Sequence, residues 1–348
     1  MQTIKLAVIG TGIIGSLYAR ICKQIFGVEV VAIHDVNEKR AEDLANELGT
    51  KAYTDLPYAP VFEENPEIDA VLICTPQDHH VEPTLAALQA GKHIQLEKPL
   101  AANVRDATKL VSAISERNVL SMVNYSLRFD PRYATMQKAI SGGEIGTIRY
   151  IHARRNPPFA GIGNRIRPGY EELPFWVGVH DIDMMRWITG SEVASVYATS
   201  TAVGHEETGL FGAILTNLVF DNGVIAVLEN AWREITSSTS RLLSIASFRV
   251  HGTRGVVEID SEGQGIRIIE DGVSFAPDTV SMPEVASQIV GTYRNQTEHF
   301  IRCLRENRPT GIPPTDGLMG VVVAEAILKS LKEGREVHLE EEFPVNEI

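Results

Sequence analysis

A short strand, a glycine-rich turn and a helix follow one another near the start of the chain, and this succession restricts the fold more than any other feature. Residues 5–9 (Lys-Leu-Ala-Val-Ile) form an apolar run typical of a buried strand. Residues 10–15 read Gly-Thr-Gly-Ile-Ile-Gly, and residues 16–26 have the apolar spacing of a helix. Such glycines allow a tight turn, a close approach of the backbone to a pyrophosphate, and close packing of helix on strand. The sequence therefore predicts a dinucleotide-binding unit, with phosphates on the N–H groups that open the helix.

A second buried strand, residues 30–34, ends in an acid at the position that this interpretation requires. Asp35 follows Gly15 by about twenty residues, the spacing expected for a carboxylate that binds the adenosine ribose hydroxyls. Its charge would repel the 2′-phosphate of NADP. No arginine follows directly, and Arg40 is expected at an ordinary solvated helix position. NAD is the predicted cofactor and NADP is less favoured; the alternative is a glycine-rich turn in an unrelated α/β protein.

Composition excludes several classes of partner. The chain has 348 residues, enough for two domains, and its formal net charge of −13 argues against nucleic acid and anionic membranes. Three cysteines, Cys22, Cys74 and Cys303, are far apart and lack the spacing of a metal site, so no metal is expected. No apolar run is long enough to span a membrane, and no signal peptide precedes the first strand. We expect a cytoplasmic protein.

Strands and helices alternate as far as residue 124. Helices are predicted over 38–48, where Asn37 and Gly49 serve as caps, and over 104–117. Near-continuous apolar runs, typical of strands buried on both faces of a parallel sheet, occupy residues 69–74, 93–96 and 120–123. The run at 69–74 leads into Thr75-Pro76, and ligands bind at such carboxyl ends. This pattern predicts a doubly wound domain over residues 1–124.

The pattern changes after residue 124. Asn222-Gly223 is a strong hairpin signal between two long strand-like runs, and a second hairpin is predicted at 252–255. The predicted helices are 130–141, 180–188, 292–306 and 316–332, and the predicted strands are 148–155, 193–201, 211–220, 224–232, 242–251 and 256–260. Runs of strands after βαβ units predict a second α/β domain, residues 125–348, with a large and mostly antiparallel sheet.

Lys98 lies one residue beyond a strand end and precedes a proline. A group that withdraws the hydroxyl proton is needed when a secondary alcohol loses hydride, and a lysine of lowered pKa can serve. The alternative is a surface lysine that closes a turn.

Several motifs in a fixed order identify a resemblance. They are Gly10–Gly15, Thr75-Pro76-Gln77-Asp78-His79-His80, Gly91-Lys92-His93, Glu97-Lys98-Pro99-Leu100, Arg128-Phe129-Asp130-Pro131, His180-Asp181-Ile182-Asp183, Glu298-His299-Phe300 and Asp316-Gly317-Leu318. Together they resemble the Gfo/Idh/MocA family of sugar and polyol oxidoreductases over essentially the whole chain. The resemblance implies a Rossmann domain followed by an α/β domain whose sheet has one open face. That face implies a homodimer or homotetramer.

The resemblance also implies roles for individual residues. Lys98 and His180 are the predicted catalytic residues. For His180 the predicted role is proton exchange with solvent, because an imidazole changes charge near neutral pH. The predicted cofactor contacts are Gly10, Thr11, Gly12, Ile13, Ile14, Gly15, Asp35, Thr75, Pro76, His80, Glu97 and Lys98. The predicted substrate contacts are Ser126, Asn156, Trp176 and Asp183. For two of these residues a purely structural role is the alternative. His180 would then only form hydrogen bonds at the end of a helix, and Asp183 would only complement the helix dipole.

One position departs from the family pattern. The family often has an aspartate four residues before this histidine, where the present chain has Trp176. An indole can stack on a sugar face but accepts no proton. We therefore expect Lys98 and His180 to act without that carboxylate, with Trp176 as an apolar wall of the substrate pocket.

The sequence leaves two questions open, the role of an arginine-rich segment and the reaction catalysed. Four arginines between Arg154 and Arg167 predict either a lid that binds a carboxylate or phosphate, or a solvated loop. For the activity, the leading hypothesis is an NAD-dependent dehydrogenase acting on a secondary alcohol of a sugar or polyol. The alternatives are a redox-neutral glycosidase of the same fold and a non-catalytic NAD-binding regulator.

Overall fold

A computed structural model describes residues 3–159, 172–202, 209–233, 244–261, 263, 265–270 and 273–344. Two large β-sheets form the framework of the fold. Contacts between residues divide the chain into two compact units. The first contains residues 1–126 and 281–319, and the second contains residues 127–280 and 320–348. The predicted division into domains 1–124 and 125–348 stays a prediction.

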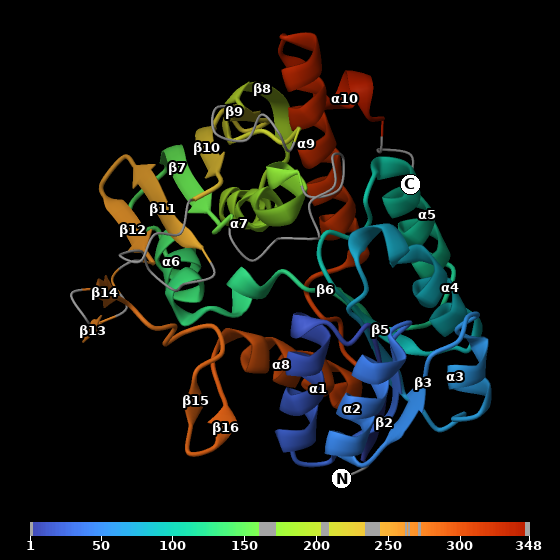
Figure 1. The fold of residues 1–348 in the computed structure, drawn as a ribbon. Coiled ribbons are helices and arrows are strands. Elements are labelled where there is room, and N and C mark those ends of the chain that lie inside the picture. Colours follow the sequence, from blue (N-terminus) through green and yellow to red (C-terminus); the bar gives the residue numbers. More distant parts are fainter. Residues whose placement is uncertain are drawn as a thin grey trace. The chain divides into compact units, whose positions relative to one another are not determined.

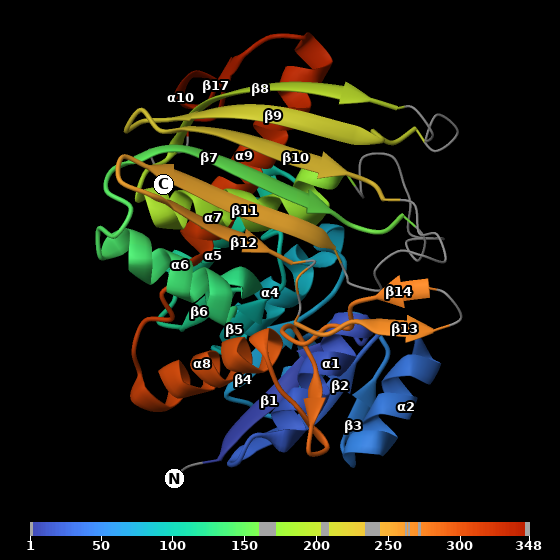
Figure 2. The same ribbon diagram turned by 90° about the vertical axis from the view of Figure 1, so that its left-hand side faces the viewer.

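The first unit contains a six-stranded parallel sheet with the order β3-β2-β1-β4-β5-β6. Figure 1 labels β2, β3, β5 and β6 of this sheet, and Figure 2 labels all six strands. This order reverses direction beside β1, which is where doubly wound folds bind their ligands. Its strands are β1 (Ile4–Ile9), β2 (Val28–His34), β3 (Lys51–Tyr53), β4 (Ala70–Ile73), β5 (His93–Leu96) and β6 (Ser121–Val123).

Helices connect these strands, as the alternating pattern predicts. They are α1 (Ile13–Gln24), α2 (Glu38–Leu48), α3 (Ala59–Glu63), a 3₁₀ turn at Gln77–His79, α4 (Val81–Gln89) and α5 (Val104–Ser115). The caps predicted for α2 are present: the Asn37 side chain accepts a hydrogen bond from the Arg40 N–H, and Gly49 has a left-handed conformation. Local chemistry therefore sets the ends of this helix.

A later part of the chain also belongs to the first unit. It contains a short hairpin, β15 (Glu284–Val285) and β16 (Gln288–Ile289), and helix α8 (Thr292–Glu306). The ring of Tyr293 packs edge-on against that of Tyr18 in α1, with centroids 5.8 Å apart. Helix α8 is thus part of the core beside α1.

The second unit contains a seven-stranded sheet with the order β12-β11-β7-β10-β9-β8-β17 (Figure 2). Only the β7–β10 pair is parallel among these neighbours, so the sheet is mostly antiparallel, as predicted. Its strands are β7 (Ile148–Asn156), β8 (Val193–Thr201), β9 (Ala213–Phe220), β10 (Ile225–Ala231), β11 (Ile245–Gly252), β12 (Val256–Asp260) and β17 (Val337–His338). A separate hairpin consists of β13 (Ile268–Glu270) and β14 (Val273–Phe275).

The remaining elements are a 3₁₀ turn (Ser126–Phe129), α6 (Pro131–Ser141), a π-helical turn (Pro174–Gly178), α7 (Val179–Thr189), α9 (Pro314–Glu333), which crosses the unit boundary, and α10 (Leu339–Glu342). Strands β9 and β10 meet at the predicted Asn222-Gly223 turn, where Gly223 has a φ of +83°. The Tyr133 ring of α6 packs against Phe248 on one face of the large sheet. The other face exposes large apolar side chains, namely Tyr150, Tyr197, Leu215, Val219, Ile225 and Val256.

Candidate functional site

The glycine turn between β1 and α1 leaves room for a ligand at the start of the helix. A Cβ atom built on Gly12 meets no protein atom within 4 Å, whereas one on Gly15 would lie 1.8 Å from the Gly10 carbonyl oxygen. Gly10 has a φ of +88°, which favours glycine. Gly12 caps α1 without any side-chain hydrogen bond, and the next residue, Ile13, is 68% exposed. The first N–H groups of α1 therefore lack a side-chain cap, as a helix end that receives phosphate requires.

Asp35 lies beside this turn and is held by it. Its Oδ2 accepts hydrogen bonds from the N–H and hydroxyl of Thr11, at 2.7 and 2.9 Å, and its Oδ1 accepts one from the Asn37 N–H at 2.8 Å. Arg40, at an exposed position of α2 as expected, also donates to Oδ1, at 3.1 Å. Burial alone would raise the pKa of Asp35, but these hydrogen bonds and the charge of Arg40 lower it below its usual value.

The loops that follow β4 and β5 are joined by a buried histidine. His80 Nε2 lies 2.9 Å from the Thr75 carbonyl oxygen, and Nδ1 lies 3.2 Å from that of Leu100. Burial lowers the pKa of His80 despite these two carbonyl oxygens. His80 is 1% exposed, so it holds the two loops together from within the protein. Pro76 is exposed beside it.

Glu97, next to Lys98, ends a chain of buried hydrogen bonds. Tyr18 donates to Gln296 Oε1 at 3.2 Å, and Gln296 Nε2 donates to Asn124 Oδ1 at 2.5 Å. Asn124 Nδ2 in turn donates to Glu97 Oε1 at 2.9 Å, while the Lys98 N–H donates to Oε2 at 3.3 Å. Burial raises the pKa of Glu97, against the opposing charge of Lys98 and the Asn124 hydrogen bond. This chain fixes the backbone from which Lys98 projects.

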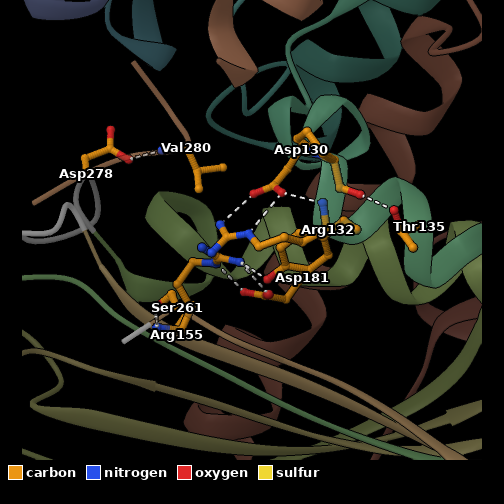
Figure 3. Close-up of polar contacts among 11 residues, drawn as sticks. Asp130, Arg132, Thr135, Arg155, Asp181, Ser261, Asp278 and Val280 are labelled. Carbon is orange, nitrogen blue, oxygen red and sulfur yellow. Dashed lines mark hydrogen bonds and ion pairs between the residues drawn. The ribbon is translucent and has the colours of Figure 1, made fainter. Parts of the chain in front are cut away.

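Helix α7 carries His180 and is anchored by a buried ion pair on the next residue. Arg155 of β7 donates to both oxygens of Asp181, at 2.7 and 2.9 Å, and also contacts the Tyr133 hydroxyl at 3.2 Å (Figure 3). A second pair, Asp130 and Arg132, lies beside it at the start of α6 (Figure 3). Burial raises the pKa of Asp181, although Arg155 opposes that shift. The pair fixes α7 against the sheet and so fixes the backbone at His180.

The four predicted substrate residues occupy different surroundings: Asn156, Trp176 and Asp183 belong to the second unit, and Ser126 belongs to the first. The Asp183 carboxylate is buried, and both its oxygens accept hydrogen bonds from Arg128, at 2.9 and 2.6 Å. Asn156 lies on the open face of the sheet, where its Nδ2 donates to Glu229, whereas Arg155 faces α7. Trp176 is half-buried in the π-helical turn before His180, and Ser126 is buried in the first unit. The Asn156 side chain therefore lies on the opposite face of β7 from that of Arg155.

Arg154, Arg155 and Asn156 belong to the end of β7, so the first part of the predicted arginine-rich loop is a strand. Arg165 and Arg167 lie outside the described residues. Within the described residues no cluster of three acidic, histidine or cysteine side chains is arranged to hold a metal ion. The helices described here include none with the length and apolar character needed to cross a bilayer.

A parallel sheet of order 3-2-1-4-5-6, with an uncapped helix after a glycine turn and an acid after β2, defines a dinucleotide-binding protein of the Rossmann class. Residues 4–125 match the profile of the oxidoreductase family Gfo/Idh/MocA, described as an NAD-binding Rossmann fold, and residues 137–339 match the α/β domain that follows it in that family. The chain belongs to the Gfo/Idh/MocA oxidoreductase family.

Known relatives align with nearly the whole chain. Myo-inositol 2-dehydrogenase of Thermotoga maritima is 28% identical, over 97% of this chain and 99% of the relative. An NAD⁺-dependent scyllo-inositol 2-dehydrogenase of Bacillus subtilis is also 28% identical, over 97% and 96%. The crystal structure of a scyllo-inositol dehydrogenase from Lactobacillus casei with NAD(H) and scyllo-inositol superposes with a TM-score of 0.84 at 23% identity, over 97% and 99%. The fold class, the oxidoreductase class and the NAD cofactor predicted from the sequence are confirmed.

Proposed function

We propose that this protein oxidises a secondary alcohol of an inositol-like polyol or a related sugar, with NAD as the hydride acceptor. The open N-terminus of α1 beside the hydrogen-bonded Asp35 carries the proposal, because it offers a phosphate site and a ribose site in the required order. The inositol dehydrogenases among the relatives support the choice of a cyclic polyol. The residues around the glycine turn and in the loops after β4 and β5 are the proposed cofactor contacts.

Lys98 is the proposed base that withdraws the proton of the reacting hydroxyl. When bound, NAD⁺ supplies the acceptor for the hydride that leaves the same carbon. The hydrogen-bonded Glu97 holds the turn from which the Lys98 side chain extends. His180 is the proposed group that exchanges the proton with solvent, since an imidazole changes charge near neutral pH.

The proposed substrate contacts are Ser126, Asn156, Trp176 and Asp183. Trp176 would form an apolar wall, since its indole has one N–H donor and no acceptor. For Asp183 the proposal carries a condition, because both carboxylate oxygens already bind Arg128. A substrate hydroxyl at Asp183 would have to share that carboxylate with the guanidinium.

The open face of the large sheet is the proposed contact between subunits in a homodimer or homotetramer. Tyr197, Leu215 and Ile225 on neighbouring strands are 41%, 49% and 55% exposed. A large exposed apolar patch marks an interaction site, because monomers rarely expose one. The cytoplasmic location predicted from the sequence stays a prediction.

A panel of polyols and glycosides incubated with the protein and NAD⁺ tests the activity. We expect NADH to accumulate with an inositol-like polyol. Release of an aglycone without NADH would instead indicate a redox-neutral glycosidase, and NAD⁺ binding without any turnover would indicate a regulator.

The variant Lys98→Met tests the proposed base. It should lower kcat by about 10²–10⁴, the range for a general acid or base, and leave the Kd of NADH within about threefold. Lys109→Met, at an exposed position of α5, is the matched control. Equal activities of the two variants would remove Lys98 from the mechanism.

A further inference from the structure

Asn124 has a side-chain amide whose orientation is set by two other buried amides. Asn124 directly follows β6, and its Oδ1 accepts hydrogen bonds from Gln95 Nε2 of β5 at 2.9 Å and from Gln296 Nε2 of α8 at 2.5 Å. All three residues are at most 2% exposed. Because two donors converge on Oδ1, the amide N–H groups of Asn124 must point the other way, toward Glu97.

This orientation of Asn124 favours the charged form of Glu97. Glu97 Oε1 accepts a hydrogen bond from Asn124 Nδ2 at 2.9 Å, and Oε2 accepts one from the Lys98 N–H at 3.3 Å. Hydrogen bonds donated to a carboxyl group stabilise its ionised form, whereas burial favours its neutral form. A proton placed between Oε1 and Nδ2 would leave two donors facing each other. The amide of Asn124 therefore opposes the neutralisation of Glu97 by burial.

Three other titratable groups face Glu97 or Lys98, and all three are neutral near pH 7. Tyr18 of α1 and Cys74, which follows β4, face Glu97, and burial raises the pKa of both. His80, which precedes α4, faces Lys98, and burial lowers its pKa. Among these groups, the charge next to Lys98 therefore depends on Glu97.

We propose that Asn124 is a positioning residue for the reaction: its amide keeps Glu97 ionised, and Glu97 sets how readily Lys98 takes up the hydroxyl proton. This inference rests on the role of Lys98 as the base in the function proposed above. A nearby carboxylate favours the protonated amine, so an ionised Glu97 makes Lys98 a stronger base. Without the amide of Asn124, Glu97 is neutral in a larger fraction of the molecules, and Lys98 loses its proton at a lower pH.

The pH dependence of lysine acetylation by acetic anhydride, followed by peptide mass spectrometry on the whole protein, tests the proposal without any need for turnover. The midpoint of the Lys98 curve should fall by about one pH unit in Asn124→Leu, the lower end of the effect of a nearby charge. In Gln296→Met, which keeps the hydrogen bond from Gln95, the fall should be smaller. Lys109, exposed on α5 of the same molecule, is the internal control, and its midpoint should not change.

Glu97→Gln measures the whole effect, because it removes the charge outright. Adding Asn124→Leu to this variant should shift the Lys98 midpoint no further, since Asn124 acts through Glu97. In the polyol assay, the acid limb of the pH profile of kcat/KM should move together with this midpoint.

The possible results separate this inference from the proposed function. If Glu97→Gln lowers the Lys98 midpoint and neither amide variant does, the role of Asn124 is disproved. An unchanged midpoint in Glu97→Gln would mean that Glu97 is already neutral, which also overturns the inference. A protein that yields no NADH with any polyol overturns the proposed function instead, and the labelling midpoints still decide whether Asn124 acts on Glu97.

Discussion

Replacing Gly12 by alanine should separate cofactor binding from folding. Gly12 has φ −64° and ψ −166°, an extended conformation that any residue adopts. An added Cβ meets no protein atom within 4 Å. The folded chain therefore tolerates the methyl group, and the space that the methyl group enters is the space proposed for the pyrophosphate.

The extended backbone of Gly12 and the open space beside it determine the expected changes in the free energies of folding and of NADH binding. For folding, a change from glycine to alanine at a compatible position stabilises by about 0.4–1 kcal/mol, because the unfolded chain loses freedom. For binding, the methyl group keeps the phosphate from the helix N–H groups, and each hydrogen bond to a charged group contributes about 1.5–3 kcal/mol. Losing one such bond raises the Kd of NADH at least about tenfold. Gly12→Ala should thus unfold at or above the wild-type temperature and bind NADH poorly.

Gly15→Ala is the matched control in the same turn. Its Cβ would lie 1.8 Å from the Gly10 carbonyl oxygen and 3.1 Å from Cys74 Cβ. Backbone atoms cannot move aside as a flexible side chain can, so overpacking should cost at least about 1–3 kcal/mol. Thermal unfolding and NADH calorimetry on both variants provide the assay. Wild-type NADH affinity in Gly12→Ala would refute the proposed phosphate position, and an unfolding temperature below that of Gly15→Ala would refute the packing argument.

Three further predictions concern stability and assembly. Asp181→Asn leaves the guanidinium of Arg155 buried without its counter-charge, so chemical denaturation should show a loss of about 3–5 kcal/mol. Glu258→Gln, in the exposed pair with Arg249, should cost far less, because solvent screens that pair; similar losses in the two variants would contradict the argument. The pKa of His80 is lowered in the folded state, so below about pH 6.5 the unfolded chain binds more protons and the free energy of unfolding falls. His80→Gln should therefore lose less of its melting temperature than the wild type between pH 7 and pH 5. The same dependence of melting temperature on pH in both proteins would contradict this prediction. Leu215→Asp, on the open sheet face, should lower the mass measured by light scattering, whereas a monomeric wild type would rule out that interface.

The parts of the fold that could be predicted follow from local rules. The glycine turn, the caps of α2 and the Asn222-Gly223 hairpin each depend on a few adjacent residues whose backbone preferences are strong. The open-faced sheet followed from the resemblance and from strands that succeed one another. These elements needed no knowledge of distant contacts.

Contacts between distant residues could not be predicted in this way. Gln296 of α8 joins Tyr18 to Asn124, which are 278 and 172 positions away in the chain. Asp183 meets Arg128 at a separation of 55 residues. A single sequence gives no sign of such pairs, because the same glutamine or aspartate is equally compatible with a solvated helix face. The pairing of Arg40 with Asp35 is close in sequence, but it depends on the angle at which α2 leaves β2.

Strand alternation explains the surroundings of the substrate candidate Asn156. Successive side chains of a strand point to opposite faces, so two adjacent residues of β7 serve different surfaces. Arg155 faces inward and holds α7 through Asp181, whereas Asn156 faces outward, where its amide donates to Glu229 and its Oδ1 accepts from the Ala231 N–H. Because the sequence pattern indicated a loop after residue 155, it placed no constraint on the face that Asn156 occupies. A shift of β7 by one residue would exchange the positions of Arg155 and Asn156. An amide would then be buried beside Asp181 in place of the guanidinium that neutralises it. The ion pair therefore also specifies the register of β7 against α7.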